Sequence, residues 1–176
     1  MPWMVLLAAI EFAIPLQPGT WWEYRESYAE RLGEIDSIND DLTRFEVRGP
    51  QERLYIHQTG GADPASGPVE VGEGWIRLAS WTGEDALPLP LAVGRKGPVS
   101  EAGAAAWTVE AEEEVTVPAG TFRTLRCALR TPSAVAILWI ATGVGIVREQ
   151  QGAAGTRPQI ERVLLRRWIA PSPSLD

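Results

Sequence analysis

The chain has 176 residues, of which 45% are hydrophobic, and it carries a formal net charge of −7. This length suits one domain with one core, and the hydrophobic content excludes an intrinsically disordered chain. The negative charge disfavours binding to phosphate backbones, so nucleic acid is not expected as a partner. The 17 Gly and 14 Pro leave little room for long helices and favour many short strands joined by turns.

An apolar run opens the chain over residues 2–10, is broken by Glu11 and resumes over residues 12–16. It resembles the hydrophobic part of a secretion signal, although no Lys or Arg precedes it. Residues 1–18 are therefore interpreted either as the remnant of a signal or as an N-terminal extension. The first interpretation places the protein in the periplasm or outside the cell, and the second leaves it in the cytoplasm. The run is too short to span a bilayer, so no transmembrane span is expected.

Alternating apolar and polar residues recur along the chain, whereas the i, i+3, i+4 spacing of a helix is hard to find. In the first half, the predicted strands cover residues 20–31, 42–49, 53–59 and 69–81, the last with a hairpin or bulge at Gly72 and Gly74. In the second half, they cover residues 107–117, 121–130, 134–141, 145–151 and 159–168. About eight to ten strands at this spacing predict an all-β fold. We expect a single curled antiparallel sheet, an open barrel or half-barrel, over residues 19–170, followed by a flexible tail at 171–176.

A hairpin is predicted around Pro118-Ala119-Gly120, because Pro fixes φ at the start of a tight turn and Gly accepts a positive φ at its end. The strand before it is expected to place on one face Trp107, Val109, Ala111, Val115 and Val117, with Glu113 as the exception. A three-residue loop puts Val117 opposite Thr121. The same register pairs Ala111 with Cys127 and Val109 with Leu129, and it pairs Glu112 with Arg126 on the outer face.

The sequence suggests few groups that could carry chemistry. His57 is the only histidine and Cys127 the only cysteine, so no metal site or cofactor is expected. A dyad of these two residues is disfavoured because Cys127 falls on the apolar face and His57 on the outer face. Glu113 is expected to pair with an Arg or to line a polar opening. The acidic cluster of Asp36, Asn39, Asp40 and Asp41 lacks the calcium-loop pattern and is interpreted as a solvated loop.

The tryptophans give the one positive functional signal. Trp21 and Trp22 are neighbours, so they point to opposite faces of one strand, and residues 137–140 are apolar on both faces. A sheet with two apolar faces requires a covering element, a partner or a ligand groove. The predicted ligand-binding residues of a concave apolar face are Trp21, Trp22, Trp75, Ile137 and Trp139.

Three segments in this order carry a family resemblance: Gly19-Thr20-Trp21-Trp22-Glu23-Tyr24-Arg25, Glu114-Val115-Thr116-Val117-Pro118-Ala119-Gly120-Thr121-Phe122, and Trp139-Ile140-Ala141-Thr142-Gly143-Val144-Gly145-Ile146-Val147-Arg148-Glu149. They resemble a bacterial domain family of unknown function that is described as TapB-like, with Thr142 where the family usually has Pro. The resemblance implies a curled antiparallel β domain, loosely similar to the half-barrel lipoprotein carriers of the bacterial envelope. It implies no catalytic residues.

These observations favour a non-enzymatic domain of the bacterial envelope that binds a hydrophobic small molecule or lipid, or a partner segment, in the apolar concave face. One alternative is a structural or assembly module that binds another protein. A second alternative is a hydrolase that uses Glu113 or His57.

Overall fold

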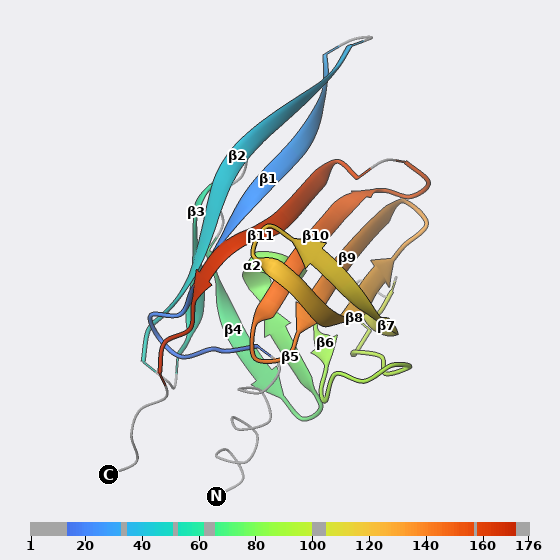
Figure 1. Cartoon of the computed structure of the whole chain (residues 1–176). Helices are drawn as coiled ribbons and strands as arrows, with labels where there is room; N and C mark the ends of the chain where they lie inside the picture. Colours follow the sequence, from blue (N-terminus) through green and yellow to red (C-terminus); the bar gives the residue numbers. More distant parts are fainter. Residues whose placement is uncertain are drawn as a thin grey trace, which may run out of the picture.

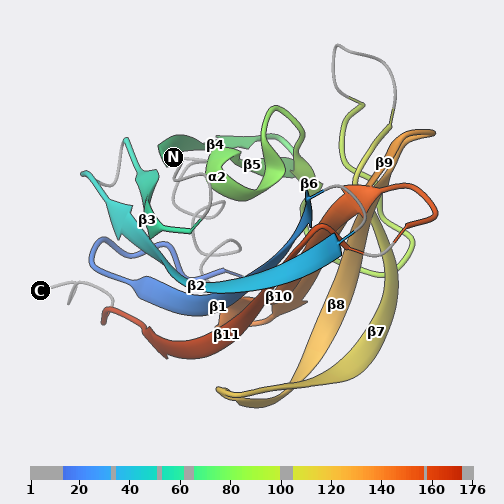
Figure 2. The same cartoon turned by 90° about the horizontal axis from the view of Figure 1, so that it is seen from above.

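The computed structural model describes residues 14–32, 35–50, 53–61, 66–99, 105–156 and 158–171. Within these residues, eleven antiparallel strands form one sheet in the order β6-β5-β4-β3-β2-β1-β11-β10-β9-β8-β7. The sheet curls into a nearly closed barrel (Figure 1 and Figure 2). The predicted all-β class and the single curled antiparallel sheet are thus confirmed. The interpretations of residues 1–13 and 172–176 fall outside the described residues.

The sheet consists of two meanders that meet where the first strand pairs with the last. The first contains β1 (Trp21–Leu32), β2 (Ile35–Arg48), β3 (Tyr55–Gly60), β4 (Ser66–Gly72), β5 (Trp75–Leu78), the short helix α2 (Ala79–Thr82) and β6 (Leu87–Pro88). The second contains β7 (Thr108–Val117), β8 (Gly120–Arg130), β9 (Ala134–Ala141), β10 (Gly145–Ala153) and β11 (Ile160–Trp168). β1 and β11 join them, with Trp21 opposite Trp168 and Tyr28 opposite Ile160.

The chain after β6 brings the two outer edges of the sheet together. Gly94 N–H donates to the Val109 carbonyl at 2.8 Å, and Val109 N–H donates to the Arg95 carbonyl at 2.9 Å. Gly97 N–H donates to the Trp107 carbonyl at 2.8 Å. This segment therefore gives β7 backbone partners on its open side and covers an edge that would otherwise be free.

The main core fills the inside of the barrel, around α2. Trp81 of α2 stacks on Phe45 with ring centroids 4.4 Å apart, and it meets the edge of Trp22 at 5.7 Å. The Trp22 indole N–H donates to the Val144 carbonyl at 2.6 Å, which satisfies its one buried polar atom. Gly67 permits this packing, because a Cβ at that position would lie only 2.5 Å from the Ala79 Cβ.

Two predicted segments differ from the structure. The acidic stretch predicted as a loop belongs to β2, where it pairs with β1 along its whole length. The predicted segment over residues 69–81 forms β4 and β5 with the expected hairpin at Gly72 and Gly74, but its last residues differ from the prediction because they turn into α2. The Thr82 hydroxyl favours this helical turn, since Oγ1 lies 3.2 Å from both the N–H and the carbonyl of Leu78.

The predicted hairpin register is wrong, although the tight reversal is present. The loop has two residues, so Val117 lies opposite Gly120, whose φ is 132°. A bulge between Val109 and Ala111 places these residues opposite Cys127 and Arg126 respectively. Because Cys127 and Arg126 are neighbours on β8, Val109 and Ala111 lie on opposite faces of the sheet. The apolar residues predicted to share one face of this strand therefore lie on two opposite faces.

The bulge allows the end of the β7–β8 hairpin to fold over the outer face of the sheet. Ala119 N–H donates to the Leu164 carbonyl of β11 at 3.1 Å, and the Trp139 indole on β9 donates to the Glu113 carboxylate on β7. Figures 1 and 2 together place this end of the hairpin and α2 on opposite faces of β10 and β11. The second apolar face expected around Trp139 is thus covered, in part, by the chain itself.

Candidate functional site

The inside of the barrel contains an ion cluster contributed by three neighbouring strands. Glu26 of β1 and Glu149 of β10 are both 0% exposed, and Arg162 of β11 lies between them at 6%. Arg162 Nε lies 2.5 Å from Glu26 Oε2, and its Nη1 lies 2.9 Å from Glu149 Oε2. Gln151 donates to the other oxygen of Glu149, and Thr43 Oγ1 donates to Glu26 at 3.1 Å. The charges are therefore paired and hydrogen-bonded, as buried charges must be.

Burial sets the electrostatics of this cluster. It raises the pKa of Glu149, and the guanidinium of Arg162 counteracts this only in part. Burial alone would lower the pKa of Arg162, but the neighbouring carboxylates of Glu149 and Glu26 hold it above its usual range. Burial, followed by the charge of Glu149, also raises the pKa of Tyr24 well above its usual range. Since all these groups are shielded from solvent, the cluster holds the strands together and offers no accessible reactive group.

The sequence contains a signal for this cluster, namely charged residues at inward positions of two predicted strands. Glu26 is two and four residues from the inward Tyr24 and Trp22, and Arg162 is two residues from the inward Leu164. Because side chains alternate along a strand, this spacing puts both charges inside the barrel. A charge at an inward position predicts an opposite charge on a neighbouring strand.

The five predicted ligand-binding residues do not share one wall. Trp22 lies inside the barrel and is fully buried, whereas Trp21 lies on the outer face with the Arg44 guanidinium 4.4 Å from its ring. Trp139 and Ile137 share the face opposite to the buried Leu138, so they too point outward. Trp75 lies on β5, where it lines an open pocket of about 530 Å³. Ligand binding by these residues remains a prediction.

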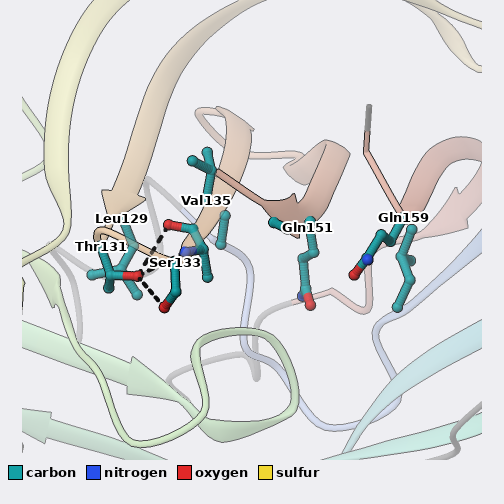
Figure 3. A pocket seen from close by; sticks show the side chains of 11 residues that line it. Leu129, Thr131, Ser133, Val135, Gln151 and Gln159 are labelled. Atoms are coloured by element: carbon teal, nitrogen blue, oxygen red, sulfur yellow. Dashed lines mark hydrogen bonds between the residues drawn. The ribbon is translucent and has the colours of Figure 1, made fainter. Parts of the chain in front are cut away.

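A shallow pocket lies at the rim of the barrel, where β8, β9, β10 and the start of β11 come together (Figure 3). Its volume is about 340 Å³. Apolar side chains of Leu129, Val135 and Ile160 contribute to its lining, and the amide side chains of Gln151 and Gln159 lie across the opening from Thr131 and Ser133. Gln151 also donates to Glu149, so the buried ion cluster lies directly below this pocket.

The residues considered for catalysis have structural partners. His57 lies on the outer face, with its Nδ1 2.8 Å from the Ser66 hydroxyl. Cys127 is fully buried, and burial raises the pKa of its thiol to about 12. Glu113 accepts a hydrogen bond from Trp139 and lies 3.4 Å from Arg126, so it pairs with an Arg, but on the outer face of the sheet and not on the inner face where it was expected. Among the described residues, no group of three or more His, Cys, Asp and Glu side chains is arranged to hold a metal ion.

The far part of the β1–β2 hairpin extends beyond the rest of the sheet (Figure 1). The pairing of β1 with β11 stops at Tyr28, and the pairing of β2 with β3 stops at Thr43. Residues 35–42 of β2 therefore have β1 on one side and, among the described residues, no strand on the other. We call this backbone the free edge of β2.

The direction of the backbone groups on the free edge follows from one hydrogen bond. Val47 N–H donates to the Thr20 carbonyl at 2.9 Å, so odd-numbered residues of β2 point their backbone groups towards β1. Backbone groups alternate along a strand, so those of Ile38 and Asp40 point to the free side. The next such amide, that of Leu42, already donates to Asp41 Oδ1 at 2.7 Å. The sequence predicts Leu42 at the start of a strand but the acidic cluster that includes Asp40 in a solvated loop, so it does not predict this edge.

No family model matches the chain, so its resemblance to the TapB-like family remains a prediction. No curated protein matches it either. In the part of the chain that the structure describes, no helix is long and apolar enough to cross a membrane.

Solved structures share the fold at low sequence identity. A Bacteroides fragilis protein described as exported, with a YmcC-like fold, is 16% identical with a TM-score of 0.50, and the match covers 89% of this chain and 99% of that one. A Parabacteroides distasonis protein described as a lipoprotein is 17% identical with a TM-score of 0.51, over 89% of this chain and 98% of that one. MucB of Pseudomonas aeruginosa, in its complex with MucA, matches at 15% identity and a TM-score of 0.44, over 99% of this chain and 58% of that chain. The first two likenesses show a shared fold.

Proposed function

We propose that this chain is a non-enzymatic binding domain of the bacterial envelope, and that it binds an extended segment of a protein partner along the free edge of β2. The observation that carries this proposal is that, in the part of the chain that the structure describes, no strand pairs with the outer side of residues 35–42, on a hairpin that projects from the sheet (Figure 1). The envelope location is supported by the apolar run near the start of the sequence and by a fold shared with proteins described as exported or as lipoproteins.

A free sheet edge recognises extended peptides through main-chain hydrogen bonds, and the neighbouring side chains supply selectivity. Eight residues of extended β2 offer an edge of about 26 Å, at roughly 3.3 Å per residue. The outward amides of Ile38 and Asp40 are donors that such a peptide would use. The capped amide of Leu42 marks the end of this surface on the side of the barrel.

The charge of the hairpin indicates the kind of partner. Over residues 29–42, the sequence has five carboxylates and a single Arg. Acidic residues on an edge discourage pairing with a second copy of the same edge, because like charges would face each other. The same charges favour a strand that carries Lys or Arg at alternate positions.

The filled interior of the barrel supports a surface site over an internal one. Trp22, Phe45 and Trp81 occupy the space that an apolar ligand would need, and each is at most 4% exposed. The concave face therefore serves as a core in this conformation. A partner that pairs with the free edge requires no rearrangement of that core.

A designed peptide tests the proposal directly. We expect a ten-residue peptide of alternating Lys and Val to slow hydrogen exchange at the amides of Ile38 and Asp40, with little change at Ser37 and Asn39, which already face β1. The substitution Ile38→Pro removes one outward donor without removing a bond to β1, so it should abolish this binding. Ile38→Ala is the matched control and should retain it.

Two results would contradict the proposal. One is peptide binding of equal strength by the Ile38→Pro and Ile38→Ala proteins, given matching circular dichroism spectra. The other is protection of amides around the rim pocket in place of those on the free edge.

The rim pocket supports a second candidate function, binding of a hydrophobic ligand. Its lining includes the apolar side chains of Leu129 and Val135, which Figure 3 labels, and that of Ile160. A fluorescent fatty acid should then bind the wild-type protein and bind Ile160→Glu more weakly. Equal fluorescence changes for the two proteins would exclude this pocket as the site.

A further inference from the structure

At the end of the sheet away from the projecting hairpin, two tryptophans lie side by side on the outer face. Trp21 on β1 is directly opposite Trp168 on β11, and paired residues of antiparallel strands share a face. Trp168 is 56% exposed, an unusual exposure for the largest apolar side chain, and Trp21 is partly exposed. We call Trp21, Trp168 and the adjacent Arg44, together with Arg53 and Tyr55 at the start of β3, the aromatic end; Tyr55 is 39% exposed and lies opposite Arg48.

Positive charge accompanies these rings. The guanidinium of Arg44 lies over the Trp21 ring, and among the described residues no carboxylate forms an ion pair with Arg44 or with the exposed Arg53. Among the residues that the structure describes, the two nearby carboxylates already form ion pairs. Glu46 pairs with Arg48 at 3.1 Å, and Glu23 pairs with Arg166 at 2.6 Å. The described residues of this end thus carry excess positive charge, in a chain whose formal net charge is −7.

The described chain also begins and ends here. Gly19 N–H donates to the Val47 carbonyl at 2.9 Å, and Ala170 N–H donates to Thr20 Oγ1 at 3.1 Å. The chain therefore enters β1 and leaves β11 beside the two tryptophans (Figure 1).

We infer that the aromatic end docks on an anionic phospholipid surface. Trp and Tyr rings are stable at the boundary between headgroups and acyl chains, and Arg donates hydrogen bonds to phosphate. Partly exposed rings beside unpaired guanidinium groups match that boundary in both polarity and charge. Docking of this kind goes beyond the proposed function, because it concerns the opposite end of the molecule from the free edge of β2.

The overall negative charge does not prevent this docking. The twelve residues of β1 span about 40 Å at roughly 3.3 Å per residue, so the acidic hairpin lies far from the aromatic end. Charges are screened over about 8 Å at physiological ionic strength. At contact distance, the local arginines therefore outweigh the distant carboxylates.

Vesicle flotation tests the inference with the full chain. We expect the protein to float with vesicles of 70% phosphatidylcholine and 30% phosphatidylglycerol, and to float less with pure phosphatidylcholine. Trp168→Ala should lower the partition coefficient about tenfold, because the exposed part of the ring no longer enters the interface. Arg53→Gln should lower binding to the anionic vesicles only. Val93→Ala is the matched control, since Val93 is also 56% exposed but lies on the segment after β6 that closes on β7.

Three outcomes would overturn the inference. The first is a wild-type protein that does not float with anionic vesicles. The second is equal flotation of the wild-type and Trp168→Ala proteins, with circular dichroism showing that both are folded. The third is a wild-type dimer that Trp168→Ala converts to a monomer, which would make the aromatic end a contact between two copies.

Discussion

Arg162 lies between two carboxylates inside the barrel, where each of the three charges depends on the others for solvation. Removing one partner of such a cluster leaves an uncompensated buried charge, whereas replacing the whole cluster with apolar residues is often neutral. We expect Arg162→Met to lower the free energy of unfolding by about 3–5 kcal/mol, measured by urea denaturation. The triple variant Glu26→Leu, Arg162→Met and Glu149→Leu should regain most of that loss. A triple variant less stable than the single one would show that the cluster stabilises the fold by itself.

The raised pKa of Glu149 makes a prediction about pH. Folding favours the protonated form of this residue, so its contribution to stability is fully present below its ordinary pKa of 4.5 and is lost as the pH rises through the higher folded value. Glu149→Gln lacks this titration. From pH 4.5 upwards, the wild-type protein should lose stability relative to the variant, measured as the difference between their unfolding free energies. A difference that does not change with pH would contradict the raised pKa.

Cys127 provides a chemical test of burial. Its pKa of about 12 leaves almost no thiolate at pH 8, and the side chain is closed to reagents. A thiol reagent such as Ellman's reagent should therefore label the protein in urea and leave the folded protein unlabelled for hours. Rapid labelling without urea would show that the interior opens to solvent, and it would support a reactive cysteine.

At the scale of the elements, the sequence predicted the strands well and their exact pairing less well. Alternation around Trp107 and Val117 was visible, but the bulge that moves these residues to opposite faces leaves no mark that alternation alone can reveal. The prediction was wrong at Asp40 and Asp41, because their charge indicated a solvated loop, whereas both residues lie on β2 and pair with β1. The opposite directions of Trp21 and Trp22 followed from backbone geometry. Which of the two lay inside depended on the partner strands, and these could not be assigned from one sequence.

The helix α2 has a role beyond its four residues, because Trp81 fills the centre of the barrel. Trp81→Ala should lower the free energy of unfolding by about 3–5 kcal/mol, the range for loss of a buried large aromatic side chain. It should also leave an apolar space next to Phe45 that a dye such as anilinonaphthalene sulfonate can enter. The matched control is Trp75→Ala on β5, which is only half-buried and should cost less. Equal losses for the two variants would mean that Trp81 is not central to the core.

On the scale of the whole molecule, the two meanders are connected by the long pairing of β1 with β11 and by the segment after β6 that closes on β7. This continuity makes separate unfolding of the halves unfavourable. We expect a single unfolding transition over residues 19–170, with coincident curves from far-ultraviolet circular dichroism and tryptophan fluorescence. Two separated curves would instead divide the chain into independent units.

The hydrogen bond between Ala170 and Thr20 has a practical consequence for anyone who handles this protein. It holds the exit from β11 beside the entry to β1, so a biotin attached through a cysteine introduced at Ala170 would fix the molecule on a sensor chip by this end, because the native Cys127 is buried. The acidic hairpin would then point into the flowing solution. The immobilised protein should therefore still bind the Lys-Val peptide, while the tryptophan pair faces the chip.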